Sequence, residues 1–235
     1  MARRIRVMVV LPENNTMIEP ENSAMSPALA PLAMARVKRP LRTLLLEDLP
    51  AYAEATLDAI KPFEADPWDL VIYGCTAAGF LGGPESNARM VERLRERTGA
   101  TVVSTAGAMV DVLREDSVTE TAVVTPYLAP VNDGLRRYLE ASGIAVEILN
   151  SFFCKTTAEL GAVTEDQVLE FARQTVTPSS KSLFVACSQL PTLRAMAQLR
   201  RDLPMPVWSS IRATAWAGAK AMTANGLPAQ LEHAM

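Results

Sequence analysis

The chain has 235 residues, of which 49% are hydrophobic and 21% are charged, so it is long enough and apolar enough to bury a core. Its formal net charge of −3, without a long basic run, excludes the usual signature of a nucleic-acid-binding protein. No uninterrupted apolar stretch reaches about 18 residues, so we expect no transmembrane helix and no membrane partner.

Seven apolar segments rich in β-branched residues are predicted to be strands. They are almost continuously hydrophobic, which is typical of parallel strands buried on both faces. In chain order they are residues 5–10, 69–74, 100–104, 120–126, 144–149, 182–187 and 205–210. The first could pass for a signal peptide, but its apolar run of about six residues is too short, so we predict a buried strand. The proline-rich stretch 20–68 is predicted to hold loops, one helix and one strand near 33–38 or 42–46.

Segments of helical period separate these strands. Residues 84–99 begin with a proline and end with a glycine, as helices often do. Residues 164–174 begin with a capping-box pattern, in which Thr164 is followed three positions later by Gln167. Residues 211–226 also end in a glycine. The alternation of strands and helices predicts an α/β fold with helices on both faces of the sheet.

The two halves of the chain resemble each other. "DLVIYGCTAAG" (69–79) and "SLFVACSQLP" (182–191) are both apolar strands that end in a cysteine and a hydroxyl residue. Weaker similarities relate residues 7–16 to 122–132 and residues 100–113 to 205–218. We therefore predict two pseudo-symmetric lobes, residues 1–117 and 118–235. Each lobe would hold a parallel four-stranded sheet flanked by helices, with the active site between the lobes.

Cys75 and Cys187 are the candidate catalytic residues. Both end a duplicated strand, and ligands of open parallel sheets sit at the carboxyl ends of strands. Each is followed by a hydroxyl residue, Thr76 or Ser188, which we predict to bind substrate. A buried cysteine is often only a small hydrophobic residue, but the matched context of this pair favours function. The N–H groups of a strand-to-helix turn can hold a carboxylate and help to depress a thiol pKa.

Further residues at strand ends are candidates for substrate binding. Asn14 and Asn15, in "LPENNT", can be turn residues or can donate hydrogen bonds to an anion. Tyr127, in "TPYLAP", can be a packed aromatic or can direct its hydroxyl into the cleft. Cys154 has no duplicate and is predicted to be structural. The glycines of "GFLGGP" (79–84) do not form a phosphate loop, and we predict a flexible flap there.

The sequence lacks the residues that disulfide frameworks, histidine-dependent catalytic sites and the usual zinc sites require. An odd number of cysteines, three, argues against a disulfide framework and indicates a reducing compartment, most simply the cytoplasm. The sole histidine, His233, is close to the end of the chain and is a poor candidate for a Ser-His-Asp or Cys-His site. The usual Cys/His zinc sites have too few ligands. We therefore expect no metal and no cofactor.

These motifs resemble the aspartate/glutamate racemase superfamily, and within it the branch of maleate cis-trans isomerases and arylmalonate decarboxylases. The similarity covers nearly the whole chain, and its strongest pieces are "LPENNT", "GCTAAGF", "STAGAMVDVLR", "TPYLAPVND" and "ACSQLPTL". It implies two α/β lobes with the active site between them and a homodimer or higher homo-oligomer. It also implies Cys75 and Cys187 as the catalytic pair, Tyr127 as a carboxylate-binding tyrosine, and Asn15 as the asparagine of the amino-terminal motif.

The resemblance favours one reaction but leaves the substrate open. Arylmalonate decarboxylases lack the first cysteine, so the presence of both favours an isomerase or racemase. The chain departs from the family in "PENNT" for "PSSNT", in two alanines after Cys75 and Thr76, and in Thr157, the residue nearest to a second family asparagine. We predict a cofactor-independent isomerase that uses two cysteines on a small dicarboxylate, with maleate-type cis-trans isomerisation as the first choice.

The alternatives are an amino-acid or hydroxy-acid racemase, an arylmalonate-type decarboxylase and, outside enzymes, a small-molecule binding protein with inert thiols. Rapid alkylation near neutral pH would favour an enzyme, because a catalytic thiolate reacts quickly.

Overall fold

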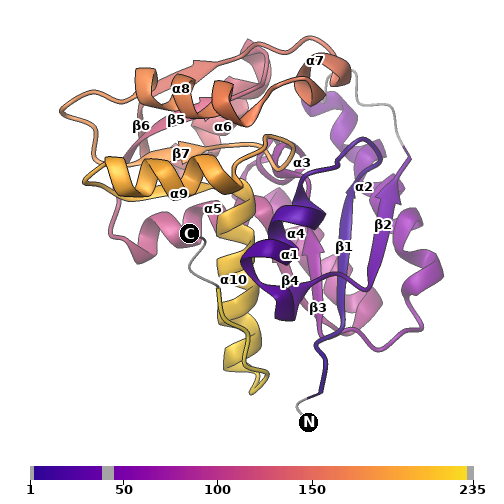
Figure 1. Cartoon of the computed structure of the whole chain (residues 1–235). Coiled ribbons are helices and arrows are strands. Elements are labelled where there is room, and N and C mark those ends of the chain that lie inside the picture. The colour runs from indigo at the N-terminus through magenta and orange to yellow at the C-terminus, as the bar shows by residue number, and fades with distance from the viewer. Residues whose placement is uncertain (1–2, 39–44, 232–235) are drawn as a thin grey trace.

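The computed structural model describes residues 3–38 and 45–231, and each half of the chain forms a four-stranded parallel sheet (Figure 1). The first sheet has the order β2-β1-β3-β4 and consists of β1 (Val7–Pro12), β2 (Ala33–Val37), β3 (Leu70–Tyr73) and β4 (Thr101–Ser104). The second has the order β6-β5-β7-β8 and consists of β5 (Glu120–Thr125), β6 (Ala145–Ser151), β7 (Leu183–Val185) and β8 (Val207–Ser209). This duplicated order confirms the predicted fold class.

Helices connect successive strands of both sheets (Figure 1). They are α1 (Ile18–Met25), α2 (Leu49–Ile60), α3 (Thr76–Phe80), α4 (Gly83–Thr98), α5 (Thr105–Glu115), α6 (Ala129–Ala141), α7 (Thr157–Gly161), α8 (Glu165–Thr175), α9 (Leu193–Asp202) and α10 (Ser210–Ala224). Short 3-10 turns are η1 (Pro27–Leu29), η2 (Leu46–Asp48) and η3 (Lys61–Phe63). No helix in the described ranges is both long and apolar enough to cross a membrane.

The local signals for helix ends are confirmed. Gly99 follows α4 with a left-handed φ of 66°, and its N–H donates to Arg95 O at 2.8 Å. Thr164 and Gln167 form both hydrogen bonds of a capping box at the start of α8. The strand expected between 20 and 68 is β2, within the range 33–38. Its alternative near 42–46 lies largely outside the described residues.

In each sheet, successive strands are added first on one side of the initial strand and then on the other, so the strand order reverses at one place. The first sheet grows outward from β1 in one direction to β2 and in the other to β3, and the second sheet does the same from β5 to β6 and β7. Open α/β sheets bind ligands at the carboxyl ends of the two strands beside such a reversal. Asn15, Cys75, Tyr127 and Cys187 follow β1, β3, β5 and β7, so the topology brings all four to this place.

Helix α10 joins the second half of the chain to the first. It packs against α5, α1 and β4, and its residues Ile211 and Ala215 share an apolar cluster with Leu70 and Ile72 of β3. The last helix therefore completes the core of the first sheet and fixes the position of the second sheet relative to it. The boundary that we propose between residues 117 and 118 lies in the turn before β5.

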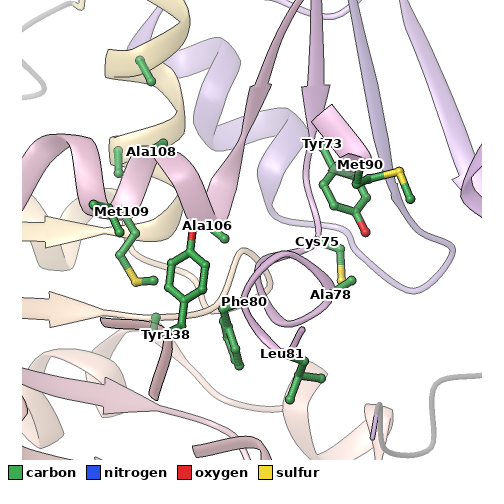
Figure 2. Packing of buried hydrophobic residues seen from close by; sticks show 14 of the residues in the cluster. Tyr73, Cys75, Ala78, Phe80, Leu81, Met90, Ala106, Ala108, Met109 and Tyr138 are labelled. Carbon is green, nitrogen blue, oxygen red and sulfur yellow. The ribbon is translucent and has the colours of Figure 1, made fainter. Parts of the chain in front are cut away.

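The predicted flap at residues 79–84 is wrong. Gly79 lies inside α3, where an added Cβ would lie 2.6 Å from Cβ of Ala106 on α5. Phe80 is fully buried and Leu81 is 7% exposed, and both belong to the apolar cluster that also contains Cys75 (Figure 2). Gly79 therefore permits close packing of α3 on α5, which is a different use of glycine from movement.

A substitution tests this packing. We expect Gly79→Ala to lower the free energy of unfolding by about 1–3 kcal/mol, because the new methyl group overfills the contact with Ala106. Gly161→Ala is the matched control, since a Cβ there meets no atom within 4 Å. Urea unfolding followed by circular dichroism measures both. An unfolding midpoint for Gly79→Ala equal to that of the unaltered protein would contradict this packing and favour the flexible flap.

Candidate active site

A pocket with a cavity volume of about 120 Å³ lies between the two halves of the chain. It is lined by all the residues predicted to form the site: Asn14, Asn15, Cys75, Thr76, Tyr127, Cys187 and Ser188. The first four come from the first lobe and the rest from the second. Asn14 is exposed at the rim, whereas Asn15 is 3% exposed.

The two thiols are buried at the floor of the pocket. Cys75 immediately precedes α3 and is 5% exposed, and Cys187 follows β7 and is 7% exposed. The backbone of Cys187 has a φ of 156°, a conformation that residues other than glycine seldom adopt. Cys187 N donates to Ser210 Oγ at 3.0 Å, and Gln189 N donates to Cys187 Sγ at 3.4 Å. Neighbouring groups thus hold both the backbone and the sulfur of Cys187.

Burial raises the pKa of both thiols, and it raises that of Cys187 to about 11. N–H groups act in the opposite direction, those of Ala77 and Ala78 on Cys75 and those of Gln189 and its neighbour on Cys187. Burial is the larger effect at both cysteines. The expected depression of the thiol pKa by the strand-to-helix turns is therefore outweighed, and both thiols are neutral near pH 7.

Three of the predicted substrate-binding residues form hydrogen bonds between the two lobes. Asn15 Nδ2 donates to Ser188 O at 3.0 Å and to Ser188 Oγ at 3.1 Å. Ser188 Oγ donates to Gly74 O at 2.6 Å, and Ser188 N donates to Thr76 Oγ1 at 3.2 Å. Asn15, Thr76 and Ser188 thus join the lobes at the pocket floor. The N–H of Ser188 donates to Thr76 and is not directed at a substrate.

The buried hydroxyl of Tyr127 lies beside Cys187 and Thr76 inside the pocket and interacts with both side chains. It lowers the pKa of the Cys187 thiol, as the hydroxyl of Tyr52 does for Cys75. The Tyr127 ring packs edge-on against Phe80 at a centroid distance of 5.7 Å, and the Tyr127 carbonyl accepts from Ser151 Oγ at 2.5 Å. Burial raises the pKa of Tyr127 well above its usual value, so the hydroxyl remains a neutral donor. A hydroxyl in this position can turn to donate to a ligand acceptor in the pocket.

Cys154 also lines the pocket, and its predicted structural role stays a prediction. Strand β6 ends at Ser151, and Phe153 then turns the chain with a φ of 52°. Cys154 N donates to Pro126 O at 2.9 Å, which places the half-buried side chain in the pocket wall. The turn separates Cys154 from its strand in the sequence. Thr157, the first residue of α7, lies in the same wall.

The sequence analysis missed two residues of the site. Tyr52 on α2 has a buried hydroxyl beside Cys75, where it lowers the pKa of that thiol. Gln189 contacts the first lobe: its Oε1 accepts from Thr16 N at 2.8 Å and its Nε2 donates to Thr16 Oγ1 at 3.1 Å. The partners are remote in sequence, so no local pattern identifies either residue.

The described residues contain no recognisable set of metal ligands. Within residues 3–38 and 45–231, no group of three or more His, Cys, Asp or Glu side chains is arranged to hold a metal ion. His233, the sole histidine, lies outside the described residues.

Comparison with known proteins relates nearly the whole chain to one family. The family model described as arylmalonate decarboxylase matches residues 10–232. The maleate isomerase of Nocardia farcinica is 28% identical over 221 residues, which are 90% of this chain and 87% of that protein. The arylmalonate decarboxylase of Bordetella bronchiseptica is 24% identical over 172 residues, which are 72% of each chain.

A solved structure provides a further similarity. It is a mutant of the Nocardia farcinica maleate cis-trans isomerase with a covalently bound succinylcysteine intermediate. It superposes on this chain with a TM-score of 0.85 at 25% sequence identity, and the match covers 93% of both chains.

The raised pKa of Cys187, about 11, predicts the pH dependence of its alkylation. Because the thiolate is the nucleophile, we expect the rate with iodoacetamide to rise about tenfold per pH unit between about pH 7 and 9. Mass spectrometry of the Cys187 peptide in quenched samples measures this rate. A rate that levels off at or below about pH 8 would contradict the raised pKa. Slow labelling at neutral pH therefore does not argue against an enzyme.

Proposed function

This chain belongs to the arylmalonate decarboxylase family, and we propose that it is an isomerase that converts maleate-type cis-dicarboxylates into their trans isomers without a cofactor. The observation that carries the proposal is the pair of buried thiols, Cys75 and Cys187, in one pocket at the ends of β3 and β7. The succinylcysteine found in a related maleate isomerase supports a covalent route through one of them.

In this route Cys75 is the nucleophile and Cys187 is the acid and base. The Cys75 thiolate forms a bond to one olefinic carbon, and the electron pair of the double bond moves toward the other carbon and its carboxylate. Cys187 donates its proton to that second carbon, which leaves a succinyl group with a central single bond. Rotation about this bond, return of the proton to Cys187 and cleavage of the C–S bond release the trans product and restore both sulfurs.

The raised pKa of Cys187, about 11, fits the role of proton donor. Cys75 must be ionised in the reactive complex, and the hydroxyl of Tyr52 together with the N–H groups of Ala77 and Ala78 favours that form. The reactive state holds one proton on Cys187 and none on Cys75, and ionisation of Cys75 raises the pKa of Cys187, so the two thiols titrate as a coupled pair.

The substrate carboxylates are bound by neutral donors. None of the described residues that line the pocket is Lys, Arg or His. The hydroxyl of Tyr127, beside Cys187 in the pocket, is proposed to stabilise the charge that develops on one carboxylate. Asn14 at the rim and Thr157 in the opposite wall are proposed to bind the other, with Thr157 in place of a second family asparagine. Asn15, Thr76 and Ser188 contribute mainly by holding the donors in place.

The other reactions of this kind of site use the same cysteines differently. A decarboxylase would use Cys187 alone as proton donor, and a racemase would place a stereocentre between both thiols. A small-molecule binding protein would use neither for chemistry. The presence of both thiols in one pocket favours the isomerase over the decarboxylase.

Two broader properties complete the proposal. All three cysteines are free, which supports a reducing compartment, most simply the cytoplasm. A homodimer or higher homo-oligomer rests on the family resemblance, and light scattering of the purified protein tests it.

Proton NMR with maleate in D₂O tests the reaction. We expect fumarate to appear with the unaltered protein and to be undetectable with Cys75→Ala and with Cys187→Ala, while circular dichroism shows both variants folded. Unchanged maleate would overturn the isomerase. Gas release from arylmalonates that depends on Cys187 alone would then identify a decarboxylase, and α-deuteration that depends on both cysteines would identify a racemase.

A substitution at Tyr127 separates catalysis from stability. Because its hydroxyl lies in the pocket beside Cys187 and Thr76, we expect Tyr127→Phe to lower kcat about 10²–10³-fold and to change the thermal midpoint no more than Tyr138→Phe does. Tyr138→Phe is the control, since that hydroxyl is bonded by Asn87 Nδ2 at 3.5 Å outside the pocket. Equal kcat values for the two variants would remove Tyr127 from the mechanism.

A further inference from the structure

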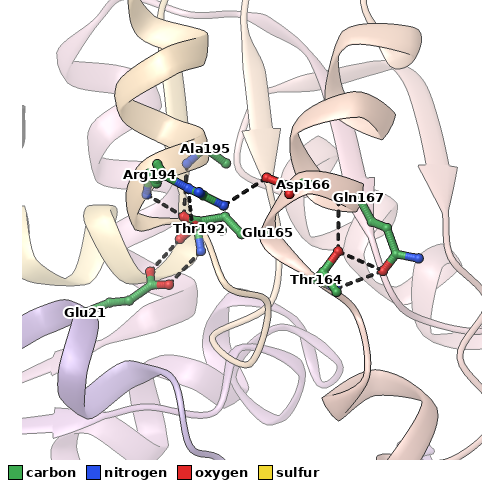
Figure 3. A network of polar contacts seen from close by, with 8 residues as sticks. All are labelled: Glu21, Thr164, Glu165, Asp166, Gln167, Thr192, Arg194 and Ala195. Carbon is green, nitrogen blue, oxygen red and sulfur yellow. Dashed lines mark hydrogen bonds and ion pairs between the residues drawn. The ribbon is translucent and has the colours of Figure 1, made fainter.

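A buried carboxylate of the first lobe reaches into the second lobe beside the active site. Glu21, on α1, is 4% exposed, and it accepts hydrogen bonds from Thr192 N at 2.6 Å and from Thr192 Oγ1 at 2.7 Å (Figure 3). Thr192 is itself fully buried, and Ser209 Oγ lies 3.0 Å from its hydroxyl. Burial of a carboxylate is costly, and nothing in the catalytic route described above uses this one.

Thr192 ends the segment 187–192 that begins with Cys187. The first lobe holds this segment at three successive points, all from residues 15–21. Asn15 binds Ser188, Thr16 binds Gln189, and Glu21 binds Thr192. The backbone of Cys187, with its φ of 156°, is in a conformation that persists only where the surroundings fix it.

We propose that Glu21 is a positioning residue for Cys187, whose carboxylate anchors the far end of segment 187–192 to the first lobe and so keeps the thiol at the pocket floor opposite Cys75. The proposal rests on the proposed function, because it assigns a residue to the same site. Glu21 does not line the pocket, so it acts through Thr192 and touches no substrate.

A second carboxylate at the same end of α9 distinguishes this role from ordinary helix capping. Glu165 of α8 accepts from the N–H groups of Arg194 and Ala195, and it pairs with Arg194 Nε at 3.2 Å (Figure 3). Glu165 thus caps the helix within the second lobe. Of these two carboxylates, only Glu21 comes from the first lobe and binds Thr192, and it also accepts from the N–H of Leu193, so removal of each carboxylate affects a different connection.

Other charged groups on the elements around Glu21 are directed elsewhere. Glu19 on α1 pairs with Arg36 at 3.9 Å, and Asp166 on α8 pairs with Arg194 at 2.8 Å. On α10, the Arg212 guanidinium lies 5.8 Å from the centroid of the Trp208 ring, and Lys220 pairs with Glu115 at 2.7 Å. No described cation pairs with Glu21.

Burial is the largest cause, and the charge of Glu165 a small additional one, of the rise in the Glu21 pKa to about 7. The folded protein therefore binds more protons than the unfolded chain between about pH 4.5 and 7, and this group lowers stability as pH rises through that range. At pH 8 the ionised carboxylate reduces the free energy of unfolding.

The test compares Glu21→Ala, Glu21→Gln and Glu165→Ala by maleate kinetics and by alkylation of each cysteine at pH 8.5. We expect Glu21→Ala to lower kcat at least tenfold with less than a threefold change in KM, and to raise the labelling rate of Cys187 at least threefold while that of Cys75 stays within twofold. Glu21→Gln can still bond Thr192 N and Oγ1, so both readouts should return to within threefold. Glu165→Ala should leave both within twofold.

Three results would overturn the proposal. The first is a kcat and a Cys187 labelling rate that are both unchanged in Glu21→Ala, and the second is the same lower kcat and faster labelling in Glu165→Ala. The third is a Glu21→Gln variant whose kcat and labelling rate resemble those of Glu21→Ala. If Glu21→Ala does not fold, Thr192→Val replaces it, with a loss of kcat of at least threefold expected and no loss contradicting the proposal. If the unaltered protein leaves maleate unchanged, the proposed reaction fails, but the ratio of Cys187 to Cys75 labelling still decides the role of Glu21.

The pH dependence of stability gives an independent readout. Relative to Glu21→Gln, the unaltered protein should lose thermal stability as pH rises from about 5 to 8, because only its buried carboxyl ionises. A constant difference in midpoint across this range would show that Glu21 does not titrate there. Such a result would mean that a positive charge lies close enough to Glu21 to keep its carboxylate ionised, which contradicts the proposed environment of this side chain.

Discussion

The pocket depends on the hydrogen bonds by which residues 15–21 of the first lobe hold residues 188–192 of the second. Asn15 and Ser188 meet at the floor, with Nδ2 to O and Oγ distances of 3.0 and 3.1 Å. These bonds are buried, so breaking one would leave polar groups without water to replace it. The apolar contact of α10 with the first sheet brings the lobes together, and the buried hydrogen bonds determine how their strand ends face each other.

The chemistry of the site follows from the balance between burial and backbone dipoles. A thiol at the start of a helix usually becomes more acidic, but here desolvation outweighs the N–H groups and both thiols stay protonated. A neutral thiol is a proton donor, and a buried tyrosine hydroxyl is a donor without charge. Such a site binds an anion with neutral groups and avoids a permanent buried positive charge.

The strand order of the two sheets is sufficient to explain why the two cysteines meet. Both sheets have the same strand order, and in both the cysteine follows the strand beside the reversal of direction. When two such sheets face each other at their carboxyl ends, the turns after β1, β3, β5 and β7 converge. Tyr127 and Asn15 occupy the remaining two turns, so the turn after each of the four strands supplies residues to the pocket.

The sequence by itself determined the elements and the candidate residues, because burial on both faces, helix capping and strand-end position leave local patterns. The strand-end cysteines, the capping box at Thr164 and the four-stranded lobes were all predictable in this way. The tertiary structure alone decided which residues meet across the lobes: the Asn15–Ser188 and Glu21–Thr192 contacts join residues 173 and 171 positions apart.

The tertiary structure also decided the state of the thiols and the place of Cys154. Depth of burial sets the direction of a thiol pKa, and depth is a property of the assembled lobes that no short segment contains. Cys154 enters the pocket through a turn after β6, and the sequence shows the turn but not the wall that it completes. Local sequence patterns specify elements because they act over a few residues, whereas a site between two lobes depends on contacts over the whole chain.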